Sequence, residues 1–210
     1  MSGELIIPSG GICQGNFTVT GSILPASART KLAIDQSAEF VIPWTFWRVW
    51  DAMQTNLPGT AASDDLALIG GTFGTNAPSI QAGDLKAAGA TSRYARCVVE
   101  IPMNFVTGGT VKIRAHAGMK TTVSDTSCTI DFSAYRSDEE DGVGSDLVST
   151  AATTINSTSE ADKDFTVDSA TLLPGDLLDI RMLIACNDGA TVTAVIPFVG
   201  AVKMLFDVQG

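Results

Sequence analysis

The feature that most constrains the fold is an alternation of apolar and polar side chains with a period of two residues. It is clearest between Leu178 and Cys186, where apolar residues occupy every second position and Asp179 and Arg181 lie between them. Successive side chains of a β-strand point to opposite faces of the sheet, so this pattern predicts a strand with one buried face and one solvated face. The strand follows Pro174-Gly175-Asp176, a sequence typical of a turn.

The same pattern recurs in short segments that Gly, Pro, Asn and Asp separate from one another. The predicted strands are Trp44–Met53, Leu66–Phe73, Arg93–Ile101, Val111–His116, Thr129–Tyr135, Phe165–Val167, Leu178–Cys186, Val192–Phe198 and Val202–Val208. Their spacing leaves no room for the helical crossovers that parallel strands need. We therefore predict an all-β protein with two antiparallel sheets packed as a sandwich. About eight or nine strands favour a jelly roll, with an immunoglobulin-like sandwich or a Greek-key barrel as alternatives.

The segment Trp44–Met53 has two interpretations. Trp47, Trp50 and Met53 have the three-residue spacing of a helix face. We prefer a strand, because tryptophan, phenylalanine and valine fit a pleated surface better.

Residues 1–40 differ from the rest in being rich in Gly, Ser and Ala with only short apolar clusters. We predict an extended N-terminal arm over 1–40 and a β-sandwich domain over 41–210. Within the arm, residues 28–35 could form one or two helical turns, which are too short to be stable unless docked on another surface.

The charge argues against nucleic acid as a partner, because a net charge of −10 repels phosphate backbones. No apolar run approaches the ~18 residues that a membrane helix needs. The start MSGELIIPSGG lacks the basic residues and long apolar stretch of a signal peptide. We therefore expect no membrane and synthesis in a cytoplasm.

Cysteine and histidine offer little chemistry in this sequence. Cys13, Cys97, Cys128 and Cys186 lie far apart, and His116 is the one histidine. That composition disfavours a zinc site, and we interpret the cysteines as small apolar residues. Lys112, Arg114 and His116 alternate with apolar residues, so we place His116 on a solvated face and predict no catalytic residue, no metal and no cofactor.

Two loops resemble ligand sites only superficially. The acidic segment 138–146 carries carboxylates of the kind that calcium uses, but without EF-hand spacing, so a solvated hairpin tip is preferred and cation binding stays open. The segment Gly70–Gly74 lacks the lysine of a phosphate-binding loop.

The three tryptophans, Trp44, Trp47 and Trp50, fall within seven residues together with Phe46. The preferred interpretation is core. The alternatives are an anchor at a subunit interface, where tryptophan is enriched, and an aromatic platform that stacks on sugars.

Three features together suggest a family. The arm ends in Ala28-Arg29-Thr30-Lys31-Leu32-Ala33-Ile34-Asp35, the stretch Pro43–Asp51 follows it, and a strand begins after Leu172–Asp176. This combination resembles virion structural proteins of tailed bacteriophages, namely the jelly-roll proteins that decorate and cement capsids or form the heads of tail fibres.

The resemblance implies a structural role without catalysis. A decoration protein of this kind is a homotrimer on the capsid exterior that binds the major capsid protein, or another virion protein, and stabilises the phage head. The interface residues we predict are Leu5, Ile6, Ile7, Arg29, Lys31, Leu32, Trp44, Trp47 and Trp50. The first alternative is a tail-fibre or receptor-binding head, and the second is a carbohydrate-binding or enzymatic β-sandwich on the same scaffold.

Overall fold

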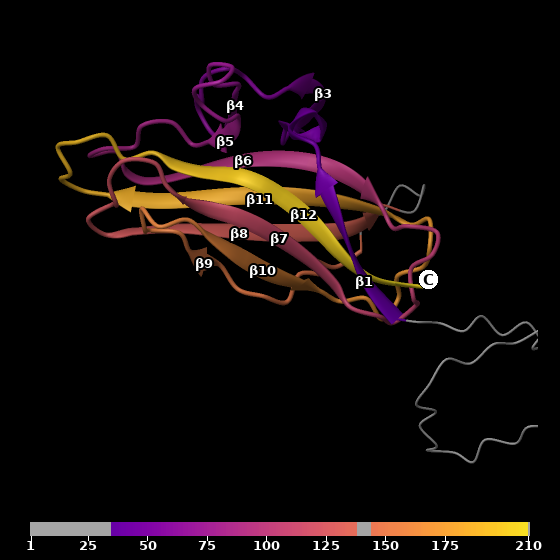
Figure 1. The fold of residues 1–210 in the computed structure, drawn as a ribbon. Coiled ribbons are helices and arrows are strands. Elements are labelled where there is room, and N and C mark those ends of the chain that lie inside the picture. The colour runs from indigo at the N-terminus through magenta and orange to yellow at the C-terminus, as the bar shows by residue number, and fades with distance from the viewer. Residues whose placement is uncertain (1–34, 138–143, 210) are drawn as a thin grey trace, which may run out of the picture. The chain divides into compact units, whose positions relative to one another are not determined.

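The computed structural model describes residues 35–137 and 144–209, which form two antiparallel β-sheets packed face to face (Figure 1). The predicted all-β sandwich is confirmed. We name the sheets after their long strands. The β7 sheet contains β1 (Asp35–Ile42), β4 (Ala67–Ile69), β5 (Ser79–Gln81), β7 (Val111–Met119), β10 (Ala161–Val167) and β12 (Pro197–Gln209). The β11 sheet contains β2 (Arg48–Val49), β3 (Ala52–Asn56), β6 (Gly89–Glu100), β8 (Ser127–Ser137), β9 (Thr153–Thr154) and β11 (Leu177–Asp188).

The strand order is that of a jelly roll. Four strands follow one another as β1-β12-β7-β10 in one sheet, and four as β6-β11-β8-β9 in the other. The chain crosses between the sheets at nearly every step from β6 to β12, which is how two Greek keys build a jelly roll. The short strands β5 and β4 extend the first sheet beyond β12, and β2 and β3 extend the second beyond β6.

The core lies between the sheets and consists of the apolar side chains at every second position of each long strand. On β11 the buried and partly exposed residues alternate from Leu178 to Asp188 without interruption. Phe165 of β10 and Phe132 of β8, both buried, meet edge to face across the two sheets with ring centroids 4.9 Å apart. This contact joins the two layers directly.

Strand β1 corrects the predicted domain boundary. Asp35–Ile42 pairs along its whole length with β12, from Asp35 opposite Gln209 to Ile42 opposite Val202. Residues 35–40, which we assigned to the arm, therefore belong to the sandwich, because they supply a backbone partner for β12. The rest of the arm, including residues 28–34 of the suggested helix, lies outside the described residues.

Three predicted strands are wrong in part. Leu66–Phe73 is a strand only over β4, since residues 70–78 form a loop. Trp44–Met53 is divided into a three-residue 3-10 helix, Trp44–Phe46, then β2, a turn, and the start of β3. Val192–Phe198 is mostly loop, since β12 begins only at Pro197. In these segments β-favouring side chains lie where the backbone forms a turn or loop, so tertiary packing overrides local preference.

Asp188 holds together the loops at one end of the sandwich. Its buried carboxylate accepts hydrogen bonds from the backbone N–H of Ala87 at 2.7 Å and of Asp125 at 2.9 Å, and from the Thr191 hydroxyl at 2.6 Å. Burial by itself would raise the pKa of Asp188, but hydrogen bonds from Thr191, Ala87 and Asp125 outweigh it and lower the pKa to about 2. The β6, β8 and β11 ends are thereby tied by one side chain.

A search of the described segments for a helix of sufficient length and apolarity to cross a membrane finds none.

Candidate ligand-binding face

The structure divides the three tryptophans among three places. Trp47 is 1% exposed and belongs to the core, as the preferred interpretation expected. Trp44 lies half-buried on the outer side of the β7 sheet, where its Nε1 donates to the Gly200 carbonyl oxygen at 3.0 Å. Trp50 lies at the β11 sheet, where its Nε1 donates to the Asp64 carboxylate at 3.0 Å. One anchor made of all three rings is therefore not formed.

The other predicted interface residues, Leu5, Ile6, Ile7, Arg29, Lys31 and Leu32, lie outside the described residues.

The outer face of the β11 sheet carries a hollow with a volume of about 250 Å³. It is lined by side chains from the β2–β3 turn and from three neighbouring strands of the sheet: Trp50, Asp51, Arg96, Tyr135, Asp179 and Arg181. The strand register explains the assembly, because Asp179 lies opposite Tyr135 on β8 and Arg181 lies opposite Arg96 on β6. Residues that are far apart in the chain thus become neighbours on adjacent strands.

An ion pair fixes one side of this hollow. The Nε of Arg96 donates to Oδ1 of Asp179 at 2.7 Å, and its Nη2 donates to Oδ2, so the contact is bidentate. The hydrogen bond to Asp179 raises the pKa of Arg96. A planar two-point contact of this kind orients both side chains more strictly than a single bond does.

An aromatic pair adjoins the hollow, since Trp50 lines it and contacts Tyr94 of β6. The Trp50 and Tyr94 rings lie tilted with centroids 5.1 Å apart, and the Arg181 guanidinium carbon lies 5.3 Å from the centroid of Tyr94. Arg181 also donates to the Ser133 hydroxyl at 3.4 Å, a long contact. The result is an apolar wall edged by a cation.

Asp131 of β8 lies on the same face of the sheet. It is opposite Leu183 of β11, and Leu183 is opposite Tyr94 of β6. Burial raises the pKa of Asp131, against the opposing effects of the Phe132 backbone hydrogen bond and the Arg181 charge. The face therefore presents carboxylates in different electrostatic surroundings.

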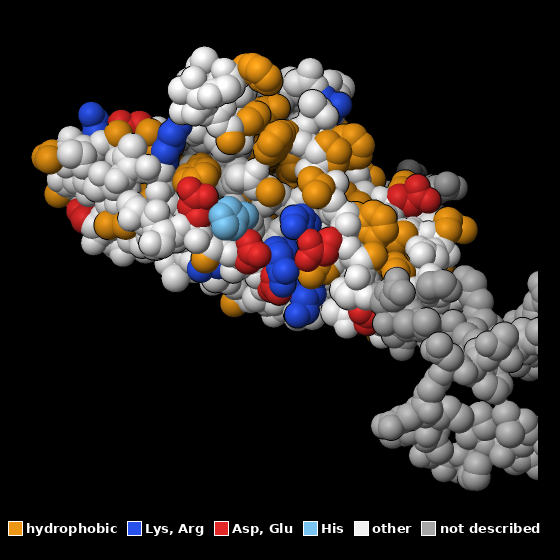
Figure 2. Space-filling view, viewed as in Figure 1, with side chains coloured by type: hydrophobic (Ala, Val, Ile, Leu, Met, Phe, Trp, Pro, Cys, Tyr) orange, Lys and Arg blue, Asp and Glu red, His pale blue; other side chains and the backbone are white. Residues whose placement is uncertain are grey.

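His116 lies on the outer face of the β7 sheet beside Lys112 and Arg114, as predicted (Figure 2). Its Nδ1 lies 2.8 Å from Oδ1 of Asp162 and its Nε2 lies 3.2 Å from Oε2 of Glu160. Both ring nitrogens thus face carboxylates, which leaves neither one free to activate a nucleophile. The sequence did not predict these carboxylates, because they come from a neighbouring strand and the turn before it.

Arg114 continues this network on the same sheet. It makes a bidentate contact with Asp164, at 2.6 and 2.8 Å, and approaches Glu39 of β1 at 3.5 Å. The mixed blue and red patch of Figure 2 is therefore largely self-neutralised. We interpret it as a solvated charge ladder across strands.

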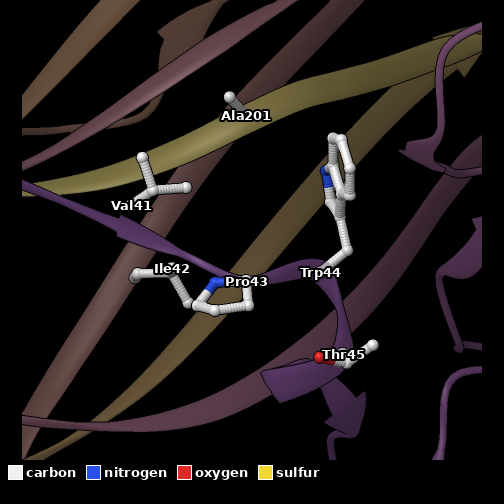
Figure 3. Close-up of a pocket in the computed structure, with 6 residues that line it drawn as sticks. All are labelled: Val41, Ile42, Pro43, Trp44, Thr45 and Ala201. Atoms are coloured by element: carbon white, nitrogen blue, oxygen red, sulfur yellow. The ribbon is translucent and has the colours of Figure 1, made fainter.

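A second hollow, of about 340 Å³, lies beside Trp44 and is almost entirely apolar. Figure 3 shows Val41, Ala201 and the Trp44 ring around one opening, with Ile42, Pro43 and Thr45 completing the lining. It offers few polar atoms, so it lacks the directional contacts that select a polar ligand.

The loops singled out in the sequence are described only in part. Within residues 35–137 and 144–209, no group of three or more His, Cys, Asp or Glu side chains is arranged to hold a metal ion. Asp146, the described end of the acidic segment, accepts hydrogen bonds from the backbone N–H groups of Ala134 and Val148, both at 3.0 Å. Residues 138–143 lie outside the description.

Comparison with known proteins yields few matches. No protein-family model and no curated protein matches the sequence. Among solved structures, a xylan-binding module of family CBM15 resembles the chain with a TM-score of 0.44 and 10% identity, over 83% of this chain and 100% of that one. A family 30 carbohydrate-binding module of a cellulosomal cellulase of Clostridium thermocellum has a TM-score of 0.39 and 8% identity, over 80% and 96%.

This comparison contradicts our expectation of a capsid decoration protein, since the two solved structures named above are carbohydrate-binding modules. We withdraw that expectation. The similarity is too distant to assign any residue of a binding site. The resemblance to phage proteins, the homotrimer and the virion location stay predictions without a test.

Proposed function

We propose that this chain is a carbohydrate-binding β-sandwich whose site is the hollow on the outer face of the β11 sheet. The observation that supports the proposal is the convergence of aromatic rings with charged donors and acceptors at one place on a rigid sheet. A sugar has apolar C–H faces and a rim of hydroxyl groups, so it needs both kinds of surface at once.

The aromatic part of the site is suited to the apolar face of a sugar ring. Trp50 is partly exposed, and its indole is held by Asp64 at 3.0 Å, so its position is fixed before a ligand arrives. Tryptophan offers a large rigid contact area with little conformational entropy to lose. Tyr135 adds a second half-exposed ring with a hydroxyl group to the lining of the hollow.

The polar part is suited to hydroxyl groups. Asp51 and Asp179 offer acceptors, and Arg96 and Arg181 offer several N–H donors in planar arrays. The bidentate pair between Arg96 and Asp179 holds these groups in place. Pre-organised groups lose less entropy on binding, which favours affinity for a polar ligand.

We further propose that the site binds without catalysing a reaction. Asp179 accepts two hydrogen bonds from Arg96 and is held as an acceptor. His116 lies on the outer face of the other sheet, with both nitrogens facing carboxylates. A general acid and base would have to meet across the ligand, and these contacts favour recognition instead.

The test is a glycan array probed with the purified full chain, followed by calorimetric titration of the best ligand. Trp50→Ala should weaken binding about 30-fold, the equivalent of the ~2 kcal/mol typical of a binding hot spot. Trp44→Ala is the matched control, because it also removes a half-buried indole with one hydrogen bond, but on the other sheet. It should leave affinity within about twofold of the unchanged protein.

Each outcome bears on the proposal. Loss of binding in Trp44→Ala with retention in Trp50→Ala would move the site to the β7 sheet and refute the location. Failure of the folded protein to bind any glycan on the array would refute the function itself. Unfolding curves of both variants separate lost contacts from lost folding.

A further inference from the structure

Two of the buried cysteines face each other on neighbouring strands. Cys128 of β8 lies directly opposite Cys186 of β11 in the register of the sheet. Both side chains point into the core, where Cys128 is 0% and Cys186 is 3% exposed. Both are free thiols, and their side chains hydrogen bond to each other.

The hydrogen bonds of the sheet show which kind of pair this is. The Cys128 carbonyl oxygen accepts from the Ile155 N–H at 2.9 Å, on the β9 side of the strand. In an antiparallel strand the N–H and C=O of one residue point to the same side, so the peptide groups of Cys128 point away from β11. Cys128 and Cys186 therefore form a non-hydrogen-bonded pair, the type in which opposite side chains come closest.

These dimensions suit a covalent link. Opposite residues of a non-hydrogen-bonded pair have Cα atoms about 4.5 Å apart, and disulfides span Cα distances of about 4.4 to 6.8 Å. Closing the bond therefore requires no change of strand register. The third described cysteine has no such partner, since Cys97 lies opposite Ile180.

We propose that Cys128 and Cys186 are a redox pair that closes to a cross-strand disulfide when the chain meets a low-molecular-weight disulfide oxidant. One thiolate attacks the oxidant and forms a mixed disulfide, and the first thiol of the oxidant leaves. The second cysteine then attacks the mixed disulfide, forms the Cys128–Cys186 bond and releases the second thiol. Two thiols of the chain lose two protons and two electrons, and the oxidant is reduced to two thiols.

Burial keeps an oxidant away from the pair in the closed fold. Donation of its S–H to Cys186, together with burial, raises the pKa of the Cys128 thiol, and the same hydrogen bond lowers the pKa of Cys186, so Cys186 is the sulfur that supplies the attacking thiolate. Cys128 is the second residue of β8, and Cys186 lies two residues before the end of β11. Local opening of this end of the sheet, which must break the Asp188 hydrogen bonds, is the route for an oxidant.

The experiment uses a full-length Cys13→Ala, Cys97→Ala variant, so that only the pair remains. The protein is incubated natively, and in a second arm refolded from denaturant, in buffers of graded oxidised-to-reduced glutathione ratio. Samples are alkylated in denaturant and analysed by intact and peptide mass spectrometry. Matched controls carry a further Cys128→Ala or Cys186→Ala change and have a single thiol.

We expect both thiols to disappear together, with a mass loss of about 2 Da, one cross-linked peptide pair and full recovery with dithiothreitol. The oxidised protein should melt about 5 to 10 °C higher, since the link restricts the unfolded chain. Two alkylatable thiols in the refolded arm at every ratio would overturn the proposal. So would a disulfide that lowers the melting temperature, or glutathione adducts in place of the internal bond. The glycan measurements are separate, so neither result depends on the other.

Discussion

Truncation of Phe165 to alanine tests whether the two sheets pack as described. Phe165 is fully buried on β10 at the edge of the β7 sheet, and its ring meets Phe132 of β8 at 4.9 Å. Removing a buried phenylalanine side chain costs about 3 to 5 kcal/mol through lost burial and the cavity left behind. About 0.5 to 1.5 kcal/mol of that belongs to the edge-to-face contact itself.

Equilibrium unfolding in urea, followed by tryptophan fluorescence, measures the effect, and the buried Trp47 contributes to that signal. The expected loss corresponds to a fall in melting temperature of roughly 6 to 20 °C for a domain of this size. Phe73→Ala is the matched control, because Phe73 is 105% exposed and its removal should change stability by no more than about 0.5 kcal/mol.

A double-mutant cycle isolates the contact between the sheets. Phe132→Ala, alone and combined with Phe165→Ala, should give a coupling free energy of about 0.5 to 1.5 kcal/mol. A loss below about 1 kcal/mol for Phe165→Ala, or equal effects of Phe165→Ala and Phe73→Ala, would refute the packing of the two layers at this point.

Two further predictions concern the loops. The pKa of Asp188 is lowered from 3.8 to about 2 on folding, so its contribution to stability is present above pH 4 and is lost as the pH falls toward 2. Acid unfolding of Asp188→Asn should start from a lower stability at pH 7 and show a shallower fall over that window, and an unchanged pH profile would contradict the assignment. Gly71 has a φ of +70°, and a Cβ there would lie 2.4 Å from the Asn76 carbonyl oxygen. Gly71→Ala should therefore destabilise by more than about 1 kcal/mol in urea unfolding, whereas Gly70→Ala, with open space, should be close to neutral; equal effects would contradict the loop geometry.

The sequence identified only some residues of the candidate site. It placed Asp179 and Arg181 on the polar face of the β11 segment, and it placed Trp50 in an aromatic cluster. The outward positions of β6 and β8 also include Tyr94, Arg96 and Tyr135, but the sequence did not mark these residues as parts of a site. Alternation shows which face of a sheet a residue occupies, and it does not show which strand lies beside it. Grouping them required the order β6-β11-β8.

The cysteine pair illustrates the same limit. Alternation predicted that Cys186 faces the core, and it does. That Cys128 lies opposite it follows from the register of β8 against β11, which depends on contacts between segments nearly sixty residues apart. Local patterns contain no information on such pairing.

The sequence by itself determined the class of this protein, because a period of two residues is a property of the extended chain and needs no partner to be recognised. It also determined the inner and outer faces of the long strands. Only the tertiary structure decided that β1 joins the sandwich, that the three tryptophans separate, and that the β2–β3 turn and three strands build one hollow. These outcomes depend on which strands pair and in what register, and that choice is made by burial and hydrogen bonding over the entire domain.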